Sequence, residues 1–142
     1  MTRVPATLAF AFVTVLVGSG LLLPAQESQD RVDKIFDRIE ESRGTALWGG
    51  IRDLEDLGRG SVEGIRKGLT RADAYVRIAA SKVLYAQEHR DEALDALAKV
   101  MAGKNAHAKK IAADMASSLV SADRNLAGTE KQKIAGSFER QA

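Results

Sequence analysis

The chain has 142 residues, of which 28% are charged and 45% hydrophobic, ordinary proportions for a folded soluble protein. It contains no cysteine, which excludes disulfides, thiolate nucleophiles and cysteine-based metal sites. Lysine and arginine total 21 against 19 aspartates and glutamates, so the net charge of +2 is too balanced for a typical nucleic-acid-binding protein.

The first 25 residues have the pattern of a secretory signal. Arg3 is followed by an apolar run over residues 6–23, which ends in "LLLPAQ". This order of charge, apolar run and small residues predicts a signal peptide that is cleaved after Ala25. An uncleaved membrane anchor through residues 6–23 is the alternative. In either case the remainder is expected to be exported, to the periplasm or the extracellular space, or to face outward from the inner membrane.

Residues 30–43 are predicted to form a lead-in or capping helix. Their apolar side chains recur at i, i+3, i+4 and i+7, the spacing of one helix face. A second helix lies between Gly44 and Gly58, a residue type that is common where helices end. Its expected inward stripe comprises Leu47, Trp48, Ile51, Leu54 and Leu57.

Four further helical stretches follow in chain order. Three have candidate capping residues: Ser61 before "VEGIRKGL", Asp73 before "AYVRIAASKVLYAQ" and Asp91 before "EALDALAKVM". Gly103 is expected to end the third of these, and "AHAKKIAADMASSLV" is the fourth. Residues 121–142 have few bulky side chains and form a tail or a short helix. No segment alternates as a strand does, so the predicted fold class is all-α.

Two consecutive helices recur along the chain. "VEGIRKGL" matches "LDALAKVM" 32 residues later, and "RIAASKV" matches "KIAADMA" 33 residues later. Such a period indicates stacked antiparallel hairpins in a short α-solenoid, with an irregular bundle as the alternative. Small side chains at the crossings would let the helices approach closely. The matched residues are Ala79 and Ala80 in the first copy, and Ala112 and Ala113, after Ile111, in the second.

The stretch "DAYVRIAASKVL" resembles the first helix of a short bacterial HEAT repeat, D-x-x-V-R-x-x-A-x-x-x-L. The pattern positions are filled by Asp73, Val76, Arg77, Ala80 and Leu84. The resemblance implies a right-handed superhelix of helix pairs that serves as a protein-binding scaffold, with two to three HEAT-like repeats over residues 44–120.

The flanking copies depart from this pattern. Asn105 stands where the capping aspartate would be, and Trp48 and two glycines stand where the alanines of the first copy would lie. Terminal repeats are commonly atypical because one of their faces meets solvent. Arg77 is expected to lie near the Asp73 carboxylate, with its stem across the neighbouring repeat.

The sequence has no catalytic or metal-binding pattern. His89 and His107 lack a second ligand at the spacing of a zinc helix, and no serine lies in a Gly-x-Ser-x-Gly elbow. We therefore expect no enzyme activity, no metal and no cofactor. A lyase-like, chromophore-handling HEAT protein is the enzymatic alternative.

The predicted partner-binding surface, termed here the basic stripe, comprises Lys67, Arg71, Lys99 and Lys104. Lys67 and Lys99 occupy equivalent helix positions, and Arg71 and Lys104 lie in equivalent loops. The stripe would suit an acidic peptide or protein surface, and a merely solvated lysine face is the alternative. The predicted function is a non-enzymatic interaction scaffold that docks to a larger partner or oligomerises, since two or three repeats are near the minimum for stability.

Overall fold

The computed structural model describes residues 13–123, 126 and 128–140, and this part of the chain contains helices and no β-strand. The predicted all-α fold class is therefore confirmed for the described residues. Residues 1–12, which include the start of the predicted signal segment, lie outside them. The elements are α1 (Val13–Glu41), α2 (Leu47–Asp56), the 3-10 helix η1 (Arg59–Ser61), α3 (Val62–Gly68), α4 (Ala74–Ala86), α5 (Arg90–Met101), α6 (Ala106–Ala122) and α7 (Gly128–Glu139).

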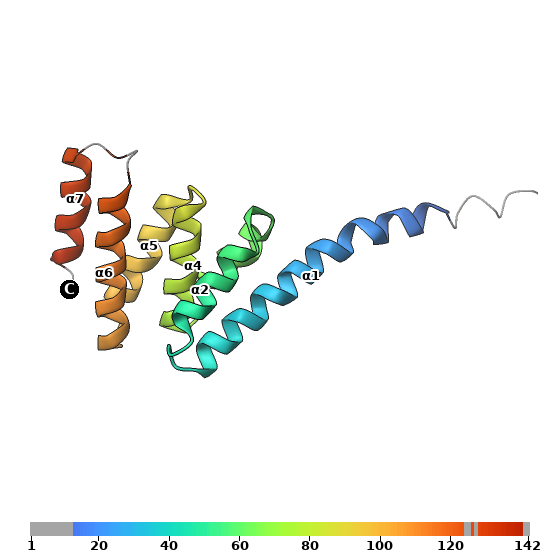
Figure 1. Ribbon diagram of the computed structural model, residues 1–142, viewed down its shortest axis with the longest axis horizontal. Helices are drawn as coiled ribbons and strands as arrows, with labels where there is room; N and C mark the ends of the chain where they lie inside the picture. Colours follow the sequence, from blue (N-terminus) through green and yellow to red (C-terminus); the bar gives the residue numbers. More distant parts are fainter. Residues whose placement is uncertain (1–12, 124–125, 127, 141–142) are drawn as a thin grey trace, which may run out of the picture.

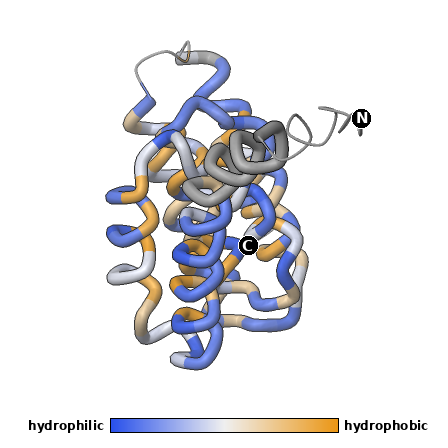
Figure 2. Tube along the Cα trace, turned by 90° about the vertical axis from the view of Figure 1, so that its right-hand side faces the viewer, coloured by the Kyte–Doolittle hydropathy of each residue, from blue (hydrophilic) through white to orange (hydrophobic). Residues whose placement is uncertain are grey.

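Most helices that are neighbours in the sequence also pack against each other in space. Figure 1 shows α1 at one end of the molecule and α7 at the other, with α2 to α6 between them. The central helix, α4, contacts α1, α2, α3, α5 and α6. The apolar stretches of the central helices lie toward the interior between them, as the hydropathy colouring in Figure 2 shows. One continuous core therefore joins the middle of the chain to both ends.

Helix α1 is longer than the predicted helix over residues 30–43, because it begins at Val13. Its end beyond the other helices projects away from them in Figure 1. Val32, Phe36 and Ile39 have no exposed surface, so this helix contributes directly to the core. No helix in the described part of the chain is both long and apolar enough to cross a membrane.

Two glycines allow α1 to pack closely on α2 and α3. A Cβ atom added at Gly50 would lie 2.6 Å from Ile39 Cγ1, and one at Gly68 would lie 2.9 Å from Ala80 Cβ. The Phe36 ring is closer still to the Gly68 position. Because real Cβ atoms are not found at such separations, α1 can pack this closely on α2 and α3 only while both positions lack side chains.

The alanine pair of α4 is part of the buried core. Ala79 and Ala80 have no exposed surface, and the Asp73 side chain accepts a hydrogen bond of 2.9 Å from the Val76 amide. The predicted cap of this helix is confirmed. Asn105 caps α6 in the same way, through a 3.0 Å bond from the Ala108 amide, so the copy that contains Ala112 and Ala113 keeps the capping geometry with a different residue.

The two glycines predicted to bracket α2 have backbone conformations that L-residues rarely adopt. Gly44 has φ of 91° and Gly58 has φ of 72°. Glycine populates this region without the steric cost that a Cβ atom imposes. The turn before α2 and the turn after it therefore follow from the local sequence.

Three local predictions were wrong. Trp48 is 62% exposed, because Leu47, Ile51 and Leu54 form the buried face of α2 and the next residue is rotated away from it. Ser61 makes no capping bond; its buried hydroxyl instead forms a 2.8 Å hydrogen bond with the Ser28 hydroxyl of α1.

Asp91, the third predicted cap, lies inside the first turn of α5, which begins at Arg90 after His89. A carboxylate is favourable at this position because of the partial positive charge at a helix N-terminus. The composition of the turn was therefore informative, although the N-cap position is His89, two residues before Asp91.

Candidate functional site

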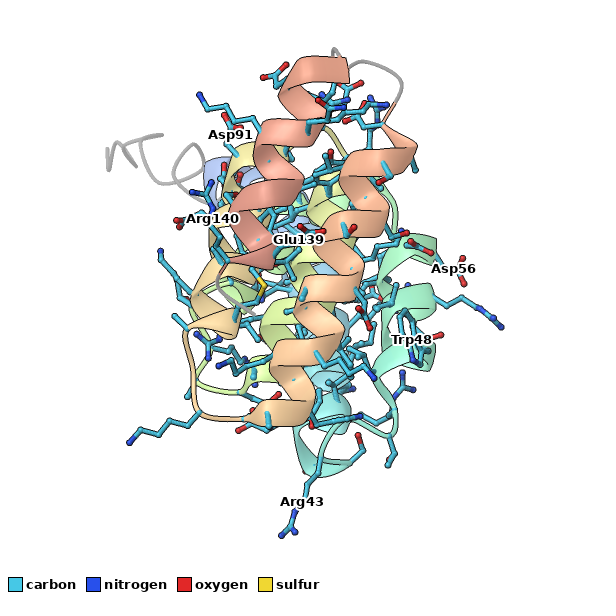
Figure 3. All side chains as sticks on the ribbon, turned by 90° about the vertical axis from the view of Figure 1, so that its left-hand side faces the viewer. Arg43, Trp48, Asp56, Asp91, Glu139 and Arg140 are labelled. Carbon is cyan, nitrogen blue, oxygen red and sulfur yellow. The ribbon has the colours of Figure 1, made fainter. Side chains whose placement is uncertain are left out.

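An open apolar groove lies where α2, α4 and α6 meet. Its volume is about 230 Å³. The lining residues are Trp48 from α2, Lys82 from α4, and Ile111, Asp114, Met115, Ser118 and Leu119 from α6. Figure 3 shows Trp48 on α2, on the side of the molecule where α6 and α7 lie in front. We refer to this feature as the Trp48 groove.

One face of α6 supplies most of the groove. Ile111, Met115 and Leu119 follow each other at intervals of four residues, which aligns them along one side of the helix. Met115 is buried, whereas the other two are half-buried. These three side chains form an apolar strip that no other described helix covers completely.

Trp48 is the one described large hydrophobic side chain that is prominently exposed. An indole at 62% exposure leaves much of its apolar surface in water, which is unfavourable in proportion to the apolar area. Exposed aromatic side chains beside an apolar strip are typical of surfaces that bind other molecules.

The charged groups of the groove are not balanced. The Lys82 ammonium pairs with the Glu55 carboxylate of α2 at 3.3 Å. Asp114 is exposed and makes no ion pair among the described residues, not even with Lys110 one turn earlier on α6. Lys82 is therefore neutralised by Glu55, whereas Asp114, which also lines an adjoining pocket with Lys109 and Lys110, has no ion pair among the described residues.

The four residues of the predicted basic stripe do not share one environment. Lys67 on α3 and Lys104 in the turn after α5 are exposed. Lys99 pairs with Asp95 on its own helix at 2.7 Å. Arg71 forms ion pairs with carboxylates of α1, so its charge is already compensated within the protein.

Arg71 connects the turn after α3 to α1. Its guanidinium lies 2.7 Å from Asp37 and 3.2 Å from Asp33, and 5.5 Å from the centre of the Phe36 ring. The hydrogen bond to Asp37 raises the pKa of Arg71, against the opposing effect of desolvation. The residue therefore acts as a clamp between α1 and the turn that precedes α4.

A second charged contact joins α3 to the start of α5. Arg66 donates hydrogen bonds to Glu92 at 2.8 and 3.1 Å and to Glu63 at 2.7 Å. The bond to Glu92 is the main cause of the raised pKa of Arg66. His89 lies beside this group, 3.3 Å from Arg66, which places the histidine in an ion-pair network.

A third polar group, the Tyr85 cluster (Tyr85, Arg90 and Asp123), is largely buried. The Tyr85 hydroxyl donates to the Asp123 carboxylate at 3.0 Å, and Arg90 pairs with the same carboxylate oxygen. Burial, reinforced by the bond to Asp123, raises the pKa of Tyr85 to about 12. The cluster joins the end of α4 and the start of α5 to the end of α6.

The predicted repeat positions lie mainly in the core. Val76, Ala79, Ala80, Leu84 and Ala112 are buried, whereas Ile111 and Ala113 are half-buried. Arg77 differs from the expectation, because its guanidinium donates to the Ala72 carbonyl at 3.3 Å and not to the Asp73 carboxylate. Its buried Nε has no hydrogen-bond partner.

Sequence reasoning missed the Trp48 groove. The available signal was the position of Trp48 directly after Leu47: two adjacent residues cannot both occupy the centre of one buried helix face. The apolar strip of α6 gave no signal of its own, because Ile111, Met115 and Leu119 fit the pattern of an ordinary core-facing stripe.

His107 lies in the first turn of α6 and contacts Tyr75 of α4. Its Nδ1 is 3.0 Å from the Tyr75 hydroxyl, and the two residues are 32 positions apart. In the described part of the chain, no group of three histidine, aspartate or glutamate side chains is arranged to bind a metal ion.

No protein-family model, curated protein or solved structure significantly matches this chain.

Proposed function

We propose that this chain is an exported, non-enzymatic protein-interaction module whose binding surface is the Trp48 groove. The observation that carries the proposal is an exposed indole beside a continuous apolar strip on α6. Helical scaffolds bind extended or helical peptides in such grooves, where apolar side chains supply most of the affinity. The same groove replaces the basic stripe as the proposed partner site, because Arg71 and Lys99 already have carboxylate partners.

The proposed architecture is a short α-solenoid of two to three HEAT-like hairpins. Three observations support it. The helix pair α2 and α4 and the pair α4 and α6 are in contact, as equivalent helices of adjacent repeats would be. Asp73 and Asn105 cap α4 and α6 at equivalent positions. The Tyr75–His107 contact joins residues one repeat apart.

Export is proposed from the apolar run over residues 6–23 and the small residues that follow it. The contacts of α1 are compatible with cleavage after Ala25. Ser28, which follows Ala25 by three residues, forms a hydrogen bond with Ser61. Cleavage would therefore leave the described contacts of α1 intact, and an uncleaved anchor would leave them equally intact.

The proposal is tested by panning a random peptide library on the immobilised purified chain. We expect enriched peptides that bind the wild-type chain and lose binding to Trp48→Ala. That variant removes an exposed side chain, so its circular dichroism and melting should match the wild type. The matched control is a chain with Lys67→Glu and Lys104→Glu, the two residues of the basic stripe that form no ion pair among the described residues.

Each result of the panning has a defined meaning. Binding that requires Trp48 and tolerates the two lysine substitutions supports the groove. Acidic peptides that require the two lysines would overturn the groove and restore the basic stripe as the partner site. A failure to enrich any peptide on the folded wild-type chain would argue against a peptide-binding function.

A further inference from the structure

The geometry points to a basic side chain, arginine or lysine, flanked by apolar residues on a partner protein, as the occupant of the Trp48 groove. This inference rests on the proposed function of the groove and adds the chemistry of its ligand. It differs from the acidic partner expected from the basic stripe, because the charge that the groove leaves without a counterion is negative.

Lys82 already has a counterion within the protein. An acidic ligand would need this ammonium, which is the basic group among the lining residues. Glu55 already pairs with it at 3.3 Å, and both side chains are only partly exposed, at 31% and 43%. Binding a ligand carboxylate would therefore require breaking an existing ion pair, at a cost that a basic ligand avoids.

Asp114 is the acidic residue of the groove lining. This carboxylate lines the groove, is exposed, and has no ion-pair partner among the described residues. A guanidinium or ammonium that approached it would form a charge-assisted hydrogen bond without displacing a protein cation. Asp114 is thus the available anchor for a ligand cation.

Apolar side chains line the groove together with Asp114. Trp48 is the preferred aromatic partner for a cation–π contact, and it lines the same groove as Asp114. The methylene stem of arginine or lysine can lie along apolar surface while its charged end stays at the rim. Ile111 and Leu119, which line the groove and are half-buried, supply such a surface.

The test uses short peptide libraries in which one central position is fixed and its flanking positions are randomised. Matched libraries carry arginine, glutamine or glutamate at the centre, and each is panned on the purified wild-type chain and on Trp48→Ala. We expect Trp48-dependent binders predominantly from the arginine library. The same number of panning rounds on each library makes their enrichment directly comparable.

Affinity is then measured from the fluorescence of Trp48, which is the single tryptophan of the chain and therefore reports on the groove alone. Entry of a ligand should shift its emission to shorter wavelength, because the exposed indole loses contact with water. We expect Asp114→Asn to weaken binding of the arginine peptides about tenfold, the size expected for a hydrogen bond to a charged group. Added salt should weaken the wild-type complex more than the Asp114→Asn complex.

The matched control is Asp91→Asn, which also removes an exposed carboxylate. Figure 3 shows Asp91 and Trp48 in separate parts of the molecule. This variant should bind the arginine peptides as the wild type does. Equal weakening by both substitutions would show that the effect is one of net charge, and it would overturn the role of Asp114.

The outcomes separate this inference from the proposed function. Trp48-dependent binders from all three libraries in equal measure would overturn the basic ligand and leave the groove as a peptide site. Glutamate-library binders that do not need Trp48 would overturn both proposals. Concentration-dependent self-association that Trp48→Ala abolishes, measured by light scattering, would identify a second copy of the chain as the occupant and overturn the inference.

Discussion

The two terminal helices, α1 and α7, cover opposite ends of the molecule in very different ways. Helix α1 buries Val32, Phe36 and Ile39 completely and fits against two glycines. Helix α7 contributes Phe138, at 7% exposure, and the half-buried Ile134 to the same core. Two helices at equivalent ends of the molecule therefore bury different numbers of side chains, and we expect them to contribute differently to stability.

Helix α1 also forms more ion pairs with the rest of the protein than the described part of α7 does. Arg71 joins α1 to the turn before α4 through more than one carboxylate. The described residues of α7 show no comparable ion pair with the rest of the protein, and Lys131 donates to the Ser121 carbonyl at 3.4 Å. Helix α1 is therefore joined to the core by buried side chains and by ion pairs, whereas α7 packs on α6 through fewer buried side chains.

The sharpest way to break this comparison is to truncate one phenylalanine at each end. We expect Phe36→Ala to lower the free energy of unfolding by about 3–5 kcal/mol, because it opens a cavity in a fully buried site. Phe138→Ala should cost less, because α7 has few anchors and can open locally without unfolding of the core. Urea denaturation followed by circular dichroism measures both, and equal losses would contradict the distinction.

A second test concerns the close packing of α1 against Gly68. Gly68→Ala should lower the free energy of unfolding by about 1–3 kcal/mol, because the new methyl group overlaps the Phe36 ring and Ala80. Gly49→Ala is the matched control: it lies in α2 with no atom near its Cβ position, and should raise stability by up to about 1 kcal/mol through helix propensity. Thermal melts of the two variants should therefore shift in opposite directions.

The Tyr85 cluster, which ends just before the chain turns toward α7, gives a pH-dependent test. The pKa of Tyr85 is raised from 10.0 to about 12, so its contribution to stability is complete below pH 10 and is lost as the pH rises toward 12. The difference in unfolding free energy between the wild type and Tyr85→Phe should shrink over that range. A difference that stays constant to pH 12 would contradict the assignment.

The absorbance of tyrosinate provides a direct check of the same cluster. In a Tyr75→Phe background, Tyr85 is the single tyrosine, since the chain contains two. Asp123→Asn should lower its midpoint from about 12, because the hydrogen bond and the negative charge of Asp123 both favour the neutral hydroxyl.

The smallest expected effect concerns the clamp on α1. Arg71→Ala should lower the free energy of unfolding by about 1 kcal/mol or less, since its partners are substantially exposed and solvent screens the pairs. The loss should diminish in high salt. Lys67→Ala, which removes an exposed charge from the same region, should change stability by no more than about 0.5 kcal/mol. Identical effects of both substitutions would place Arg71 on the solvated surface.

Much of the local structure followed from residue type and spacing. Asp73 was predicted and found as the cap of α4, because a carboxylate one residue before an apolar periodic run accepts a bond from the first turn. Two of the failures, at Ser61 and Arg77, have one common cause. Ser61 and Arg77 found partners elsewhere, Ser61 on a distant helix and Arg77 on the nearby backbone, and local spacing carries no information about which of several available partners wins.

The sequence by itself determined the all-α class, the positions of most helices and the burial of the alanine pair, because these depend on backbone hydrogen bonding and on a period of about 3.6 residues. Tertiary structure alone decided that Arg71 faces α1 and that Trp48 remains in solvent over a groove. A helix buries a different face against each helix that packs on it. Which helices pack on it, and therefore which side chains stay exposed, depends on the tertiary structure. The candidate site therefore emerged where three helices meet, and no single segment of the sequence contains it.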